Sequence, residues 1–181
     1  KFILDLVKKN PNNPTYLVQY ADLLQQLNRF DESIEQYEKA IKIDAKNENA
    51  LRNVASAYKN KVLTIQQAQQ EKLSKDPNYK LNPDEYLPLL KKSAEYFERC
   101  RKSTKYSRDF EVLGELGEIY LFTKDTDKQQ YIVAELEALE LTIPQEKLER
   151  YYLVLLKLYD RMEGGTKESA IIQEKINNLK K

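Results

Sequence analysis

Three glutamates spaced four and three residues apart are the side chains that come nearest to a site for chemistry in this sequence. Glu111, Glu115 and Glu118 fall on one face of a helix that contains them. Carboxylates arranged in this way bind metal ions in some helical bundles, but those metal sites also use histidine. The sequence contains no histidine. We therefore interpret the three glutamates as a solvated acidic helix face, and we predict neither a metal site nor a cofactor.

The other arrangements that catalysis requires are also missing from the sequence. Without histidine, the Ser-His and Cys-His pairs of hydrolytic enzymes cannot form within these residues. The four glycines do not form a phosphate-binding loop. A single cysteine, Cys100, excludes an internal disulfide framework, and we expect it to be a buried, inert thiol. The prediction is that these residues do not form an enzyme.

Basic and aromatic side chains offer a second kind of chemistry, the binding of phosphate groups. The run 99–108 contains five cations and no acid, and tyrosines interleaved with lysine can stack on nucleic acid bases. A solvated helix end explains the basic run more simply, because cations are favoured in the last turn of a helix. The net charge of +1 also provides no overall attraction to a polyanion. We predict no nucleic acid partner.

The helices that would position these side chains follow a pattern that occurs more than once. The segment 33–40 places a small, a bulky and a small residue on one helical face, and the segment 93–100 repeats this pattern. A preceding pattern of large, large, small and large residues occurs three times. Its positions are Leu17, Tyr20, Ala21 and Leu24; Leu51, Val54, Ala55 and Tyr58; and Leu113, Leu116, Gly117 and Tyr120.

Together, these two patterns resemble the tetratricopeptide repeat, a helix–turn–helix unit of about 34 residues. The resemblance implies an all-α, right-handed solenoid of helix pairs that binds proteins, with an inner groove lined by the first helix of each pair. Composition agrees with a helical fold, since 41% of the residues are apolar, 33% are charged and only four are glycine.

We predict a single domain over residues 1–181, and the repeat pattern divides it into five segments. Residues 1–13 would end a preceding repeat, 14–47 form one repeat, 48–105 form a second repeat with an insertion at about 61–86, 106–141 form a third, and 142–181 form a degenerate or capping helix pair. The longest apolar runs are far shorter than the roughly 20 residues that span a bilayer, so we expect no membrane insertion by this segment.

The insertion lies between the two helices of the second repeat. The interval between matching positions grows from nine residues in the first repeat to thirty-five in the second, an addition of 26. We expect residues 60–74, which lack glycine and proline, to extend the first helix beyond the array, and Asp84 to cap the second helix. Insertions in repeat proteins often carry the binding task. Packing of the insertion against its neighbours is the alternative.

The predicted function is that of a scaffold which binds a protein or peptide partner through the inner groove or through the insertion. The residues predicted to line this groove are Gln19, Asp22, Gln26, Arg52, Asn53, Ser56, Lys59, Asn60, Glu111, Glu115 and Glu118. Two other functions fit the same sequence. One is a spacer or assembly part of a larger or envelope-associated protein, and the other is a regulatory domain joined to a catalytic domain outside this segment.

Charge is divided unevenly along the chain. Residues 61–108 contain eleven basic and six acidic side chains, whereas residues 109–163 contain six and thirteen. This division would suit a partner of mixed charge, or self-association. We do not expect binding of acidic chaperone tails. Members of the family that bind such tails carry Asn, Lys and Arg where this chain has Asp22, Glu111 and Glu115.

Overall fold

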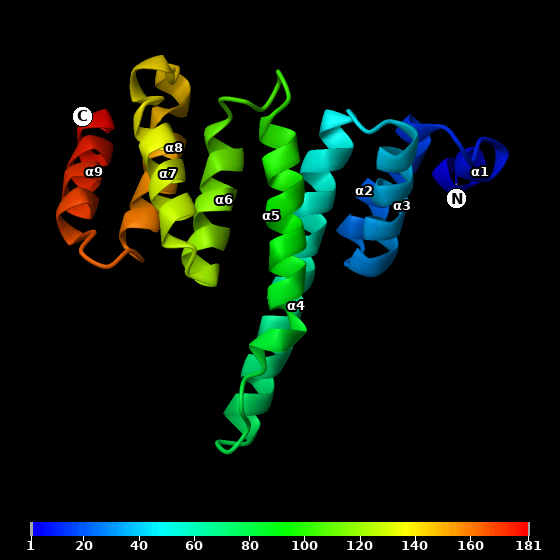
Figure 1. Ribbon diagram of the computed structural model, residues 1–181, viewed down its shortest axis with the longest axis horizontal. Coiled ribbons are helices and arrows are strands. Elements are labelled where there is room, and N and C mark those ends of the chain that lie inside the picture. The colour runs from blue at the N-terminus through cyan, green and yellow to red at the C-terminus, as the bar shows by residue number, and fades with distance from the viewer. Residues whose placement is uncertain (1, 181) are drawn as a thin grey trace. The chain divides into compact units, whose positions relative to one another are not determined.

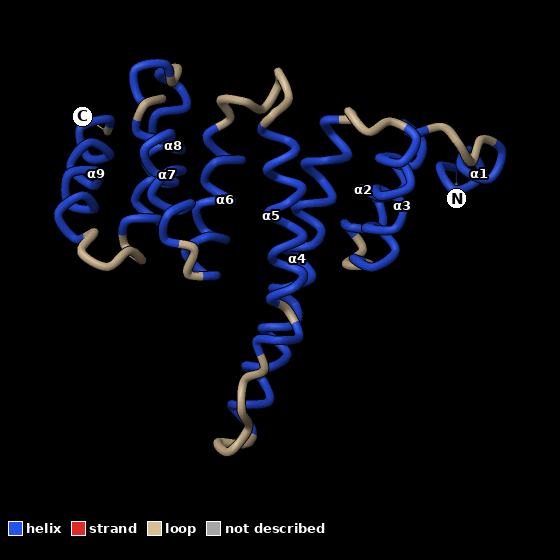
Figure 2. Tube along the Cα trace, viewed as in Figure 1, coloured by secondary structure: helices blue, strands red, loops and turns tan. Residues whose placement is uncertain are grey.

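The computed structural model describes residues 2–180, and within them the regular structure consists of helices joined by turns (Figures 1 and 2). In chain order the helices are α1 (Phe2–Lys9), α2 (Pro14–Gln26), α3 (Phe30–Ile43), α4 (Glu48–Lys75), η1 (Pro83–Glu85), α5 (Leu87–Arg101), α6 (Phe110–Thr123), α7 (Thr126–Glu137), η2 (Glu140–Thr142), η3 (Gln145–Lys147), α8 (Leu148–Tyr159) and α9 (Thr166–Leu179). The all-α helical repeat fold expected from the sequence is confirmed.

The chain forms two compact units, Lys1–Ser103 and Thr104–Lys181. In the first unit α2 packs on α3 and α4 packs on α5, and in the second unit α6 packs on α7 and α8 packs on α9. Each unit therefore contains two pairs of packed neighbouring helices. The organisation into one domain with the five predicted segments stays a prediction.

The repeated serine of the sequence pattern has the same contact in both helix pairs of the first unit. The Ser33 hydroxyl donates to the main-chain oxygen of Ala21 at 2.9 Å, and the Ser93 hydroxyl donates to that of Ala55 at 2.8 Å. Both serines are completely buried. A small side chain fits here because the two helices touch at this point, and the hydrogen bond offsets the cost of burying the hydroxyl.

The insertion extends α4 as predicted, so that this helix contains 28 residues. Its C-terminal turns and the segment 76–86 project from the rest of the first unit (Figure 1); we call residues 61–86 the arm. The predicted cap at Asp84 is wrong. Asn82 caps the short helix η1 by accepting from the Asp84 main-chain N–H at 3.2 Å, and α5 begins only at Leu87, without a side-chain cap. Pro83 explains the difference, because a residue before proline is held in an extended conformation, which suits a cap.

One buried glutamine on α4 holds the returning segment of the arm against this helix. The Gln69 side chain on α4 accepts from the main-chain N–H of Asn82 and donates to the main-chain oxygen of the same residue, both at 2.9 Å. It also donates to Glu85 at 3.0 Å. Gln69 is only 2% exposed. Its amide therefore satisfies the main chain of the returning segment as a paired strand would.

Replacing Gln69 with alanine should release the segment 76–86 from α4. The substitution leaves the main-chain groups of Asn82 without partners, at a cost of about 1–3 kcal/mol in the local opening free energy. We expect faster hydrogen exchange at the Asn82 amide and faster proteolysis of this segment. The matched control is Gln70→Ala, one residue away on the exposed side of α4. Equal exchange rates in the two variants would contradict the proposed role of Gln69.

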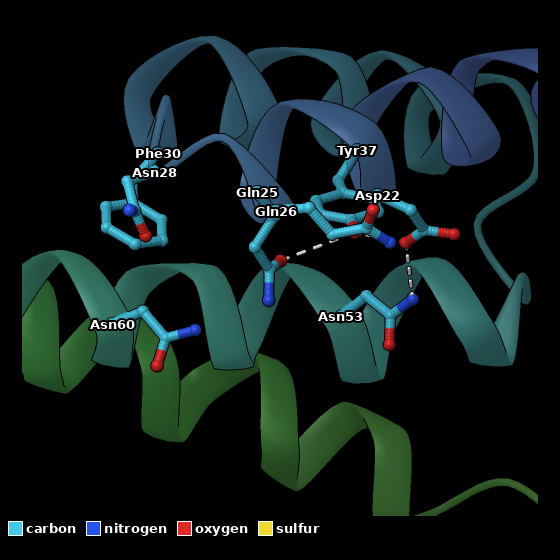
Figure 3. Close-up of a pocket in the computed structure, with 8 residues that line it drawn as sticks. All are labelled: Asp22, Gln25, Gln26, Asn28, Phe30, Tyr37, Asn53 and Asn60. Atoms are coloured by element: carbon cyan, nitrogen blue, oxygen red, sulfur yellow. Dashed lines mark hydrogen bonds between the residues drawn. The ribbon is translucent and has the colours of Figure 1, made fainter.

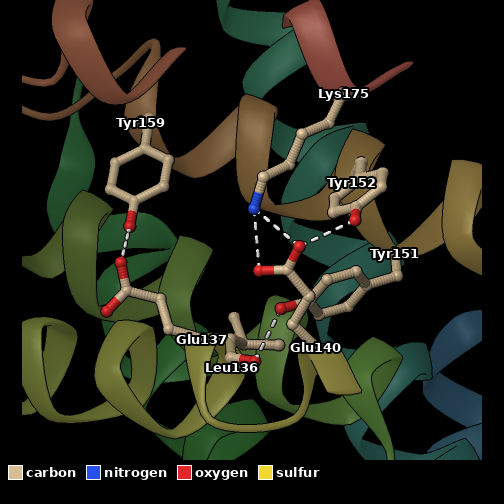
Figure 4. Close-up of polar contacts among 7 residues, drawn as sticks. All are labelled: Leu136, Glu137, Glu140, Tyr151, Tyr152, Tyr159 and Lys175. Carbon is tan, nitrogen blue, oxygen red and sulfur yellow. Dashed lines mark hydrogen bonds and ion pairs between the residues drawn. The ribbon is translucent and has the colours of Figure 1, made fainter. Parts of the chain in front are cut away.

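In the second unit, polar contacts connect α8 and α9 to η2, and α8 to the end of α7 (Figure 4). Glu140 accepts from the Tyr152 hydroxyl at 2.7 Å and from the Lys175 ammonium at 2.6 Å. The Tyr151 hydroxyl donates to the main-chain oxygen of Leu136 at 2.8 Å. Burial raises the pKa of Tyr152 to about 12, helped by the hydrogen bond to Glu140.

The first unit contains a similar arrangement. The hydroxyls of Tyr58 and Tyr96, whose rings stack with centroids 5.9 Å apart, both donate to Glu38, at 2.8 and 2.9 Å. Burial raises the pKa of Tyr96 to about 12, and the bond to Glu38 acts in the same direction.

These tyrosines predict a loss of stability in alkali. A tyrosine whose pKa is raised in the folded state keeps its proton there, whereas the unfolded chain releases that proton near pH 10, so stability falls as the pH rises above this value. We expect the urea midpoint to be constant from about pH 7 to 9 and to decrease between about pH 10 and 12. Phenolate absorption measures the ionisation of the tyrosines, and circular dichroism measures the loss of helix over the same pH range. Ionisation of every tyrosine with the helical signal intact would contradict the prediction.

Candidate functional site

A polar pocket lies in the first unit among α2, α3 and α4 (Figure 3). It is open to solvent and has a volume of about 540 Å³. Most of its lining side chains are amides. The residues that line it are Asp22, Gln25, Gln26, Asn28, Phe30, Tyr37, Asn53 and Asn60.

Asp22 connects the three helices at the base of this pocket. Its Oδ1 atom accepts from the hydroxyl of Tyr37 on α3 and from the side-chain amide of Asn53 on α4, the latter at 2.9 Å. Burial, followed by the bond to Asp22, raises the pKa of Tyr37 far above its ordinary value. Tyr37 is therefore a neutral donor at physiological pH, and Asp22 holds Asn53 in a fixed orientation.

The remaining amides offer both donors and acceptors to a ligand. The Asn53 side chain still has its carbonyl oxygen and one N–H available, because it uses a single donor for Asp22. Among the described residues, the side chains of Gln26 and Asn60 have no hydrogen-bond partner. A side-chain amide carries the same donor and acceptor groups as a peptide main chain. The pocket is therefore suited to hydrogen-bonding an extended chain, and Phe30 adds one apolar aromatic side chain to its lining.

The pocket contains only part of the groove predicted from the sequence. Asp22, Gln26, Asn53 and Asn60 line it together. The other predicted residues of the first unit do not line it: Gln19 is exposed, and Arg52, Ser56 and Lys59 are partly buried along α4. Sequence reasoning missed Gln25, Asn28, Phe30 and Tyr37. Tyr37 occupies the bulky position of the repeat pattern in 33–40, and its ring is buried, but its hydroxyl reaches the pocket.

The predicted acidic row on α6 lies in the second unit, where α8 supplies cations to it. Glu111 pairs with Arg150 at 2.9 Å, and Glu118 pairs with Lys157 at 2.6 Å. The sequence predicts a solvated acidic face here, and the ion pairs add that Glu111 and Glu118 on this face have partners on α8. The paired residues are seven positions apart on both helices, so the two ion pairs lie about two helical turns apart along the contact of α6 with α8. Whether Glu111, Glu115 and Glu118 continue the pocket of the first unit stays a prediction.

The described residues show neither a candidate metal site nor a candidate membrane span. Among residues 2–180, no group of three or more acidic or cysteine side chains is placed so that it could hold a metal ion. Within the same residues, the helices are too short or too polar to cross a bilayer.

Comparison with known proteins supports the repeat. Residues 21–62 match a family model described as the TPR repeat, the tetratricopeptide repeat. This match covers the end of α2, all of α3 and the first half of α4, which are the helices around the pocket. A comparison with curated protein sequences found no significant match.

Solved structures share the fold at low sequence identity. The structure of MamA is 14% identical with a TM-score of 0.65, over 98% of this chain and 84% of MamA. The structure of BtubC from P. vanneervenii is 18% identical with a TM-score of 0.53, over 92% of this chain and 63% of BtubC. At these identities the likeness concerns the arrangement of helices alone.

Proposed function

We propose that this chain, a tetratricopeptide repeat protein, binds an extended segment of a partner protein in the polar pocket of the first unit. The observation that carries the proposal is the set of amide side chains around Asp22, within the helices that match the repeat family. Helical repeat proteins of this kind act as protein-interaction scaffolds, and the match to the repeat family supports the same general role here.

The lining predicts how the partner would be held. Amides and one carboxylate offer hydrogen bonds to the main chain of a ligand, while Phe30 is the only large apolar side chain in the pocket. Few apolar anchors mean few strongly stabilising contacts. We therefore expect an affinity on the order of micromolar for a short peptide.

Removal of two pocket amides should weaken this binding and leave the fold intact. We propose the double substitution Gln26→Ala with Asn60→Ala, because neither side chain holds another element. Loss of hydrogen bonds to a ligand main chain should raise Kd by about tenfold, whereas unfolding should change by less than about 0.5 kcal/mol. Calorimetric titration with a peptide selected by display against the chain measures the first quantity.

The control for this pair is Gln67→Ala, because Gln67 is an exposed glutamine on α4, the helix of Asn60, and does not line the pocket. It should leave Kd unchanged. An unchanged Kd in the double variant would contradict binding in the pocket.

The arm is a second candidate surface, because Leu63 and Leu81 on it are 44% and 49% exposed. If the arm binds the partner, shortening residues 61–86 to a short turn should abolish capture while Gln26→Ala with Asn60→Ala has no effect. The spacer and regulatory functions predict that neither change affects binding by this segment.

A further inference from the structure

A second pocket lies in the second unit, where two loops meet at the start of α6. The loops are residues 104–109 and 142–147, the second of which includes the short helix η3, and the volume of the pocket is about 480 Å³. Both loops precede the first helix of a helix pair, so they lie at the same end of the unit. The lining residues are Thr104, Lys105, Ser107, Arg108, Asp109, Phe110, Glu111, Thr142, Ile143, Pro144 and Lys147.

The acidic side chains of this pocket already have partners. Asp109 caps α6 and accepts from the main-chain N–H groups of Glu111 and Val112, at 2.9 and 3.1 Å. Glu111 pairs with Arg150 at 2.9 Å. Both carboxylates are thus directed to contacts within the unit, and their charge is partly compensated.

Two cations of the pocket have no ion-pair partner within the described residues. Arg108 and Lys147 come from the two opposite loops, and neither has a carboxylate partner among the described residues. Lys105 lies over the ring of Tyr106, with its ammonium 4.8 Å from the ring centroid. Elsewhere in the unit, cations such as Lys157 and Lys175 have carboxylates at 2.6 Å. The two loops therefore bring Arg108 and Lys147 to the lining of one pocket, whereas Glu146, the acidic residue next to Lys147, is not part of that lining.

We propose that this pocket binds the phosphate group of a phosphorylated protein segment. A phosphorylated side chain carries close to two negative charges and three acceptor oxygens, which the guanidinium of Arg108 and the ammonium of Lys147 can share. Hydroxyls of Thr104 and Ser107 lie in the same lining. Ile143 and Pro144 provide apolar surface for the residues that flank the phosphate.

The charge of the unit favours a protein segment over a nucleic acid strand. Residues 104–181 contain twelve basic and fifteen acidic side chains, a net charge of −3. A strand with a phosphate at every nucleotide would extend from the pocket over an acidic surface, and like charges repel. A single phosphate on a peptide needs only the pocket. This site is separate from the amide pocket of the first unit, so the two proposals stand independently.

The test is a titration of the full chain with a phosphoserine peptide of neutral flanking sequence, followed by nuclear magnetic resonance. We expect saturable shifts of the backbone amides of 104–111 and 142–147, and none with the unphosphorylated peptide. Arg108→Gln and Lys147→Gln should each weaken binding about tenfold, since each removes a charge-assisted hydrogen bond. Circular dichroism of the variants checks that they remain folded.

Lys167→Gln is the control, because it removes one exposed positive charge of the same unit outside the pocket. Equal weakening by Lys167→Gln would overturn the proposal, since it would indicate attraction by general charge. Binding of inorganic phosphate without binding of the phosphopeptide would overturn the assignment to a protein segment. Tighter binding of a single-stranded oligonucleotide than of the phosphopeptide would overturn it in favour of nucleic acid.

Discussion

Substitution of Asp22 by alanine should reduce both the stability of the protein and its binding of a partner. The change removes the acceptor for the Tyr37 hydroxyl and for the Asn53 amide. Tyr37 is only 1% exposed, and a buried donor without a partner costs about 1–3 kcal/mol. We expect urea unfolding to measure a loss of this size, and partner affinity to decrease because Asn53 is no longer held in place.

The matched variant Asp22→Asn separates hydrogen bonding from charge. Its side-chain oxygen can accept from both donors, so stability should lie within about 1 kcal/mol of the natural chain. Equal destabilisation by Asp22→Ala and Asp22→Asn would contradict the role assigned to these two bonds.

Substitution of Gly114 by alanine should destabilise the second unit by overpacking. A Cβ atom at Gly114 would lie 2.4 Å from a methyl carbon of Val154 on α8. Forcing extra atoms into a packed contact costs about 1–3 kcal/mol, partly offset by the better helix propensity of alanine, about 0.5–1 kcal/mol. Thermal unfolding followed by circular dichroism measures the net effect.

A second substitution tests the cause. Val154→Ala removes the methyl group in the way, so Gly114→Ala should destabilise the Val154→Ala background less than it destabilises the natural chain. Gly117→Ala provides a graded comparison, because its Cβ would meet the flexible end of Leu158 at 3.0 Å. Strict additivity of Gly114→Ala and Val154→Ala would contradict the overpacking argument.

The sequence predicted those features of the fold that depend on local spacing. Ser33 and Ser93 occupy equivalent positions in the pattern, and the structure gives them equivalent hydrogen bonds. The extension of α4 followed from a stretch without glycine or proline, and the helix ends at Lys75. Both inferences needed only the periodicity and propensity of a helix.

Contacts between polar residues distant in the sequence could not be predicted. Gln69 was one polar residue of an inserted helix, and nothing in its neighbourhood indicates that it pairs with the main chain of Asn82. The pairing of Glu118 with Lys157 depends on the contact of α6 with α8, helices separated by α7. Such contacts depend on how helices pack, and single-residue propensities contain no information about this.

The candidate pocket combines positions that follow from local spacing with a contact that depends on helix packing. Register on the first helix of each pair predicted Asp22 and Asn53 on one surface, and both residues line the same pocket. The repeat register places Tyr37 at the bulky core position of its helix, and its ring is buried. Its hydroxyl contacts Asp22 because α3 packs against α2, which the repeat pattern alone does not reveal.

Binding of an extended segment in the amide pocket is the central claim, and side-chain amide resonances test it most directly. The measurement is the shift of the side-chain amides of Gln26, Asn53 and Asn60 during titration with a peptide selected by display against the full chain. We predict that these resonances move together with a single Kd, and that the Kd rises about tenfold in Gln26→Ala with Asn60→Ala. Saturable shifts confined to the arm or to residues 104–181, with these three side chains unmoved, would contradict the claim.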